Sequence, residues 1–154
     1  MYTHTKEAGF SFVELFIVMG IVAIVATIGA GAIRDYADAQ QLQAAEQTLV
    51  NLFRDTRQKT LSAETDTQFG LFIATSSVTR YMGEDYTTAS GTYEQFDLPG
   101  VALQATTSAV GDEVRFTRLT GDPSATGTIM IRHLRSDTAR TLRISDVGLL
   151  EVQP

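Results

Sequence analysis

The chain has 154 residues, of which 44% are hydrophobic and 19% charged, and it contains no cysteine. This length suits one folded domain of ordinary size, and the composition excludes a disordered or low-complexity chain. The lack of cysteine excludes disulfides, thiolate zinc sites and cysteine nucleophiles. The net charge of -6 at pH 7 argues against a general nucleic-acid binder.

Apolar residues are concentrated between Phe10 and Ile33, a stretch that carries one charge, Glu14. Because a bilayer-spanning helix needs about 20 apolar residues, this stretch suits a membrane span. It is longer than a usual signal-peptide core of roughly 7–15 residues, although the small residues at 30–32 match a signal cleavage site. A plain membrane anchor is also possible, but it leaves Glu14 unexplained, since a carboxylate at membrane depth costs about 2.5–3.5 kcal/mol.

Residues 9–18, Gly-Phe-Ser-Phe-Val-Glu-Leu-Phe-Ile-Val, resemble the N-terminal signature of type IV prepilins. The resemblance implies that residues 1–9 are a leader, which a prepilin peptidase cuts between Gly9 and Phe10. It also implies that the new amine of Phe10 is N-methylated and that Glu14 is the glutamate used in filament assembly. Glu14 of one subunit would then meet the Phe10 amine of a neighbour, so that neither charge is buried alone.

A helical pattern continues beyond the apolar stretch, with a stripe at steps of three and four residues formed by Ala39, Leu42, Ala45, Leu49, Leu52 and Phe53. The opposite face is expected to be polar and includes Asp35, Asp38, Gln41, Glu46, Gln47, Arg54, Asp55, Gln58 and Lys59. Since no proline precedes Pro99, we expect one helix from about Phe10 to Ala63. Residues 10–33 form its transmembrane or assembly half, and residues 34–64 form an amphipathic half that lies on a head formed by residues 65–154. The glycines of the first half either pack against neighbouring helices or favour local unwinding near Gly29 and Gly31.

After residue 65 the pattern changes to short alternating runs that are typical of half-buried antiparallel strands. Strands are expected at residues 68–75, 78–82, 101–105, 113–119, 128–134, 138–145 and 149–152. Turns are expected at residues 75–77, 121–127 and 146–148, and a long loop at residues 83–100. The expected fold class is α+β, a long N-terminal helix packed on an antiparallel β-rich head, and the prepilin resemblance implies a type IV pilin-like fold.

The head is similar to the GspH/FimT class of minor pseudopilins and minor pilins, through short ordered motifs at residues 69–72, 98–101, 114–116 and 142–145. This resemblance implies a low-copy subunit that helps to assemble or initiate the filament of a type II secretion system or a type IV pilus. Its partners would be other pilin-like subunits and the inner-membrane assembly platform. Before assembly it would span the bacterial inner membrane once, with a periplasmic head.

The residues predict no enzyme, no cofactor site and no metal site. His4 lies in the expected leader, and His133 lies in an expected strand beside Arg132, where a structural role is favoured. No glycine-rich phosphate loop is present in the sequence.

A basic stretch near the C-terminal end favours a second hypothesis, in which the head binds DNA or a partner through Arg115, Arg118, Arg132, Arg135, Arg140 and Arg143. A minor pilin of a DNA-uptake pilus would use such a surface, and its affinity for DNA would fall steeply with salt. A third hypothesis is a membrane-anchored periplasmic module unrelated to filaments. The choice among a secretion, a motility and a DNA-uptake filament stays open.

Overall fold

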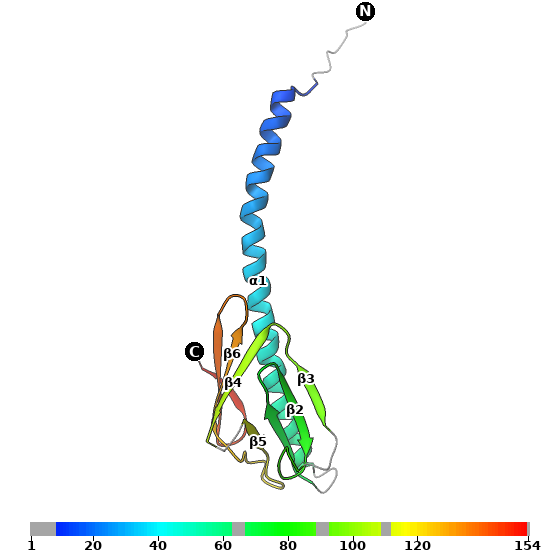
Figure 1. The fold of residues 1–154 in the computed structure, drawn as a ribbon, viewed down its shortest axis with the longest axis vertical. Helices are drawn as coiled ribbons and strands as arrows, with labels where there is room; N and C mark the ends of the chain where they lie inside the picture. Colours follow the sequence, from blue (N-terminus) through cyan, green and yellow to red (C-terminus); the bar gives the residue numbers. More distant parts are fainter. Residues whose placement is uncertain (1–8, 63–66, 89–92, 109–111, 154) are drawn as a thin grey trace, which may run out of the picture. The chain divides into compact units, whose positions relative to one another are not determined.

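The fold is α+β, with a long N-terminal helix followed by two antiparallel β-sheets (Figure 1). The computed structural model describes residues 9–62, 67–88, 93–108 and 112–153, and the side chains of residues 28–32 are not described. Residues 1–8 of the expected leader therefore lie outside the described part of the chain. Internal contacts divide the chain into two units, Met1–Ala37 and Asp38–Pro154.

Helix α1 (Phe12–Leu61) contributes to both units. It begins at Phe12, after the expected start at Phe10, and the carbonyl of Ser11 accepts a hydrogen bond of 3.1 Å from the Leu15 N–H. In the first unit, the described side chains of α1 are all exposed. A helix that is apolar on all sides is normally covered by lipid or by other protein.

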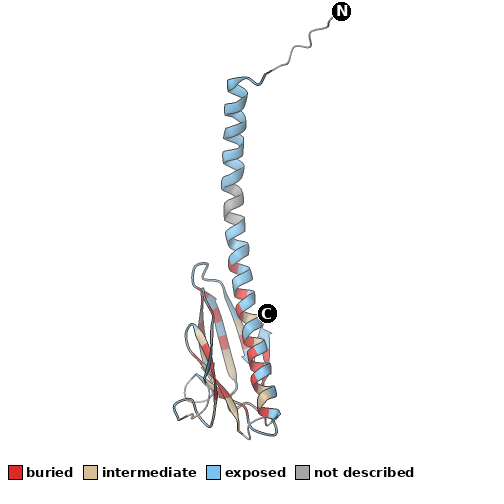
Figure 2. Ribbon diagram, turned by 90° about the vertical axis from the view of Figure 1, so that its right-hand side faces the viewer, coloured by how far each residue is buried: buried red, intermediate tan, exposed pale blue. Residues whose placement is uncertain are grey.

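The part of α1 in the second unit buries one face, at residues 38, 42, 45, 49, 52, 53, 56 and 60. The predicted stripe is thus confirmed from Leu42 to Phe53, and Figure 2 shows that the buried residues of α1 begin in this unit. One prediction is wrong, because Asp38 is buried whereas the neighbouring Ala39 is exposed. The stripe also continues through Thr56 and Thr60. Their hydroxyls donate to backbone carbonyls one turn earlier in the helix, so these polar groups keep a hydrogen bond when they are buried.

The described strands form two four-stranded sheets. One sheet has the order β3-β2-β1-β5 and comprises β1 (Phe69–Ile73), β2 (Ser77–Met82), β3 (Glu94–Asp97) and β5 (Glu113–Arg115). The other has the order β4-β6-β7-β8 and comprises β4 (Val101–Thr107), β6 (Gly127–His133), β7 (Ala139–Ile144) and β8 (Leu150–Gln153). All pairings between neighbouring strands are antiparallel.

Most expected strands are confirmed, with two differences. Strand β3 lies inside the predicted loop, where Phe96 pairs with Val78 and the remaining residues of β3 are exposed. The strand expected at residues 113–119 ends at Arg115, because the chain bends back so that Phe116 forms an isolated bridge with Pro123. The turn at 75–77 and the turn at 146–148 connect antiparallel neighbours as predicted.

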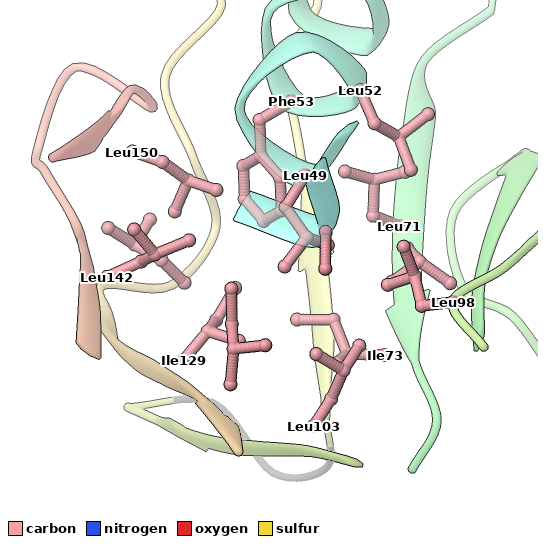
Figure 3. Packing of buried hydrophobic residues seen from close by; sticks show 14 of the residues in the cluster. Leu49, Leu52, Phe53, Leu71, Ile73, Leu98, Leu103, Ile129, Leu142 and Leu150 are labelled. Atoms are coloured by element: carbon pink, nitrogen blue, oxygen red, sulfur yellow. The ribbon is translucent and has the colours of Figure 1, made fainter. Parts of the chain in front are cut away.

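The core of the second unit lies where α1 meets both sheets. Figure 3 shows Leu49 and Phe53 of α1 among apolar side chains from the two sheets, with Leu142 on one side and Leu71 on the other. The ring of Phe53 also meets Phe116 edge-on, with 6.1 Å between the ring centroids. The second half of α1 therefore supplies a share of the head's core, which explains why its stripe is apolar.

Candidate functional site

The first unit presents a series of exposed apolar side chains, from Phe10 to Val25 and at Ile33, which we call the apolar helix surface. Its exposed fractions run from 48% for Val18 to 85% for Phe10. Its described members are Phe10, Phe12, Val13, Leu15, Phe16, Ile17, Val18, Met19, Ile21, Val22, Ile24, Val25 and Ile33. Exposed apolar areas larger than a few hundred Å² mark surfaces that bind protein or membrane. This surface is the strongest functional signal in the described chain.

Glu14 is exposed within the apolar helix surface and lies in the first turn of α1. A negative charge is favoured there, because the first turn of a helix has unpaired N–H groups and a positive dipole end. Gly9 and Phe10 precede the helix, without regular secondary structure, and both are exposed. Glu14 lies about one helical turn beyond the bond that joins them.

The predicted membrane-length segment from Phe10 to Ile33 includes residues 28–32, whose side chains lie outside the described residues. The predictions about unwinding near Gly29 and Gly31, and about a signal cleavage site at 30–32, concern this part of the chain. Within the described residues, no helical stretch combines the length and the apolar character needed to cross a membrane.

The arginines of the second hypothesis are distributed over both sheets and the connections between strands. Arg115 is in β5 and donates to the carbonyl of Glu84, and Arg118 follows β5. Arg132 is in β6, Arg135 is in the β6–β7 turn, and Arg140 and Arg143 are in β7.

Several of these arginines lie beside carboxylates of the same chain. Arg135 binds Asp38 of α1, and Arg140 binds Glu46 of α1 at 2.5 Å. Arg132 lies 3.4 Å from Asp137, and Arg143 pairs across the sheet with Glu151. Such neighbours offset the positive charge that phosphate binding requires, so these contacts do not favour a DNA-binding surface.

The sequence did not predict the role of Arg80, which is a buried charge in β2. Its guanidinium donates to Asp55 of α1 and to Glu94 of β3, and lies 5.6 Å from the centroid of the Phe96 ring. A buried charge is tolerated when it is paired in this way. Strand alternation in the sequence could have predicted this burial. Arg80 lies two residues from the buried Val78, so its side chain is on the same face of β2, towards α1. A groove of about 320 Å³ lies beside this cluster.

The outer face of the β1–β2 sheet carries a group of aromatic rings that the sequence also did not predict. Tyr86 stacks on Phe72, with 4.2 Å between ring centroids, and meets Tyr81 edge-on. The hydroxyl of Tyr81 donates to Glu113; burial, reinforced by this carboxylate, raises the pKa of Tyr81. In the following turn, hydrogen bonds from two threonines lower the pKa of Asp85 to about 2. These contacts all lie within the head and hold the segment after β2 against its sheet.

His133 lies at the end of β6 and is 3% exposed. Its Nε2 is 3.0 Å from the Oε1 of Gln41, and its Nδ1 accepts a hydrogen bond of 3.2 Å from the Ser136 N–H. The two ring nitrogens are thus satisfied by structural partners. Among the described residues, no group of three or more histidine and acidic side chains is placed to hold a metal ion.

Comparisons of the chain with protein-family models, with curated proteins and with solved structures find no significant match.

Proposed function

We propose that this chain is a type IV pilin-like subunit, a minor pseudopilin or minor pilin that acts in assembling or initiating the filament of a type II secretion system or a type IV pilus. The observation that carries the proposal is the apolar helix surface directly after the prepilin-like signature of residues 9–18. A long helix whose second half packs on an antiparallel head supports it.

The physical basis is that the apolar helix surface requires an apolar environment. Before assembly the bilayer would supply it, with the segment from Phe10 to Ile33 in the inner membrane and the head in the periplasm. After assembly the helices of other pilin-like subunits would supply it, and the subunit would work through packing and not through catalysis.

Processing and charge pairing complete the proposal. A prepilin peptidase would cut between Gly9 and Phe10 and methylate the new amine, and an inner-membrane assembly platform would extract the subunit. Glu14 would pair with the Phe10 amine of a neighbouring subunit. This pairing would select one axial position, because an unpaired carboxylate buried among apolar helices is strongly unfavourable.

The first experiment is intact mass measurement and N-terminal sequencing of the protein from membranes of its native host. A chain that begins at N-methylated Phe10 supports the proposal. A chain that begins at Met1 would indicate a plain anchor, and one that begins after Ala32 would indicate a secreted head. Either result would reject the filament role.

A second experiment tests the assembly role of Glu14. In the native host, Glu14→Leu should reduce incorporation into filaments by at least about tenfold, because the neighbour's amine would be left buried without a partner. Met19→Leu is the matched control, since it changes an exposed residue of the same helix without changing charge. If Glu14→Leu incorporates as well as Met19→Leu, Glu14 has no role in assembly.

A further inference from the structure

Helix α1 enters the second unit at Asp38, and its first contacts with the head are polar. Asp38 meets Arg135 of the β6–β7 turn, and Gln41 meets His133 at the end of β6. From Leu42 onward, buried apolar side chains of α1 join the core. The attachment of α1 to the head thus has two parts of different chemistry, and the polar part comes first along the helix.

The carboxylate of Asp38 is held by Arg135 in a two-point contact. The Nε of Arg135 donates to Oδ2 at 3.2 Å, and Nη2 donates to Oδ1. The side chain of Asp38 is 8% exposed, whereas that of Arg135 is 64% exposed. Arg135 therefore covers Asp38 from the solvent side, and neither residue belongs to the apolar core.

Gln41 joins two turns of the head to the helix. Its Oε1 faces Nε2 of His133 at 3.0 Å, and the Ser136 N–H donating to Nδ1 assigns the ring proton to Nε2. Gly100, in the turn before β4, has a φ of +79°, and a Cβ there would lie 2.7 Å from Oε1 of Gln41. The Leu134 N–H donates to the Gly100 carbonyl at 3.0 Å. The positive φ favours glycine at this position, and the absence of a side chain lets the turn approach Gln41 closely.

We propose that Asp38, Gln41, His133 and Arg135 form a polar latch that opens separately from the apolar core. When the latch is open, α1 leaves the head over residues 38–41 and stays docked from Leu42 onward. The physical reason is that one partner of each contact, Arg135 or Gln41, is exposed, so that the contact can be exchanged for water at small net free energy. The buried apolar side chains from Leu42 onward gain nothing from contact with water. Local openings of this kind require less free energy than global unfolding.

The latch sets how far along α1 the head is attached, and hence where the helix becomes free to change its direction. All four residues of the latch belong to the second unit. Their contacts are present whether or not the chain is a filament subunit, so this inference does not rest on the proposed function. A filament subunit would use such a hinge when its helix moves from one set of neighbours to another.

The test uses the full chain in detergent, with nitroxide labels on pairs of introduced cysteines. The labels attach only at these positions, because the chain contains no cysteine of its own. One label pair, Ala39→Cys with Leu134→Cys, reports on the latch, and both positions are exposed. The second pair, Gln47→Cys with Thr106→Cys, reports on the docked part of the second unit from exposed positions of α1 and β4. Arg135→Ala should raise the ratio of long to short distances about tenfold at the latch pair and leave the second pair unchanged.

Two further variants make the result specific. Arg132→Ala removes a neighbouring arginine that pairs with Asp137 at 3.4 Å, and it should leave the latch distances as in the parent. The charge reversal Asp38→Arg with Arg135→Asp should restore the short distance. The proposal is overturned if Arg135→Ala leaves the latch distances unchanged, if both label pairs lengthen together or the variant fails to fold, or if the reversal does not restore the short distance.

Discussion

Replacing Leu49 by alanine tests whether the second half of α1 is part of the head's core. Leu49 is 0% exposed and lies where the helix meets both sheets (Figure 3). The substitution removes three carbon atoms, which corresponds to about 2.4 kcal/mol at roughly 0.8 kcal/mol per buried CH₂. The cavity left behind adds to this loss, so that the expected destabilisation is about 2–5 kcal/mol.

The assay is thermal unfolding of the full chain in detergent, followed by the near-ultraviolet circular dichroism of the head's tyrosines. A loss of about 3 kcal/mol should lower the Tm by roughly 10 °C in a chain of this size. Leu15→Ala is the matched control, because Leu15 is an exposed residue of the same helix in the first unit. It should leave the Tm of the head unchanged.

Two outcomes would refute this reasoning. If Leu49→Ala lowers the free energy of unfolding by less than about 1 kcal/mol, the helix does not contribute to the core as the structure indicates. If Leu15→Ala destabilises the head as much as Leu49→Ala, the two units are not energetically separate.

Three further results are expected. Gly70→Ala should destabilise the head by about 1–3 kcal/mol in urea unfolding, because the new Cβ would lie 2.7 Å from Cε1 of Tyr81. An unchanged urea midpoint would show that the Tyr81 ring moves aside freely. Arg80→Ala should lower the free energy of unfolding by about 1–3 kcal/mol, and Arg132→Ala by less than about 1 kcal/mol. The reason is that Arg80 is buried whereas Arg132 is 57% exposed. Equal losses for the two variants would contradict the role of burial. The hydrogen bond from Arg135, together with the charge of Arg135, lowers the pKa of Asp38 below its ordinary value of 3.8. The carboxylate therefore stabilises the fold above that value and loses its contribution as the pH falls through the lowered pKa. The stability difference between the parent and Asp38→Asn should therefore be constant from neutral pH to about pH 5 and disappear in stronger acid, whereas a difference that persists there would exclude this ion pair as the cause.

Local patterns in the sequence predicted most of the secondary structure. The stripe from Leu42 to Phe53 repeats with the helical period, and the strands alternate with period two, so each element is recognisable from its own residues. Strand β3 was missed because only Phe96 in it is apolar, and it is a strand by virtue of pairing with β2. An edge strand of this kind depends on its neighbour, which short-range patterns do not show.

The residues of the candidate site likewise divide into those that local patterns predict and those that contacts between distant residues bring together. The prepilin-like signature at residues 9–18 and the apolar stretch that contains Glu14 are local features, and they suffice for the functional hypothesis. The pairing of Arg80 with Asp55, and of Arg135 with Asp38, joins residues that are 25 and 97 positions apart. The helix, the alternation of the strands and the signature can be predicted from local patterns, because they depend on neighbouring residues. The burial of Arg80, the pairing of the arginines with carboxylates and the first contact between α1 and the head cannot be predicted in this way, because they depend on contacts between distant parts of the chain.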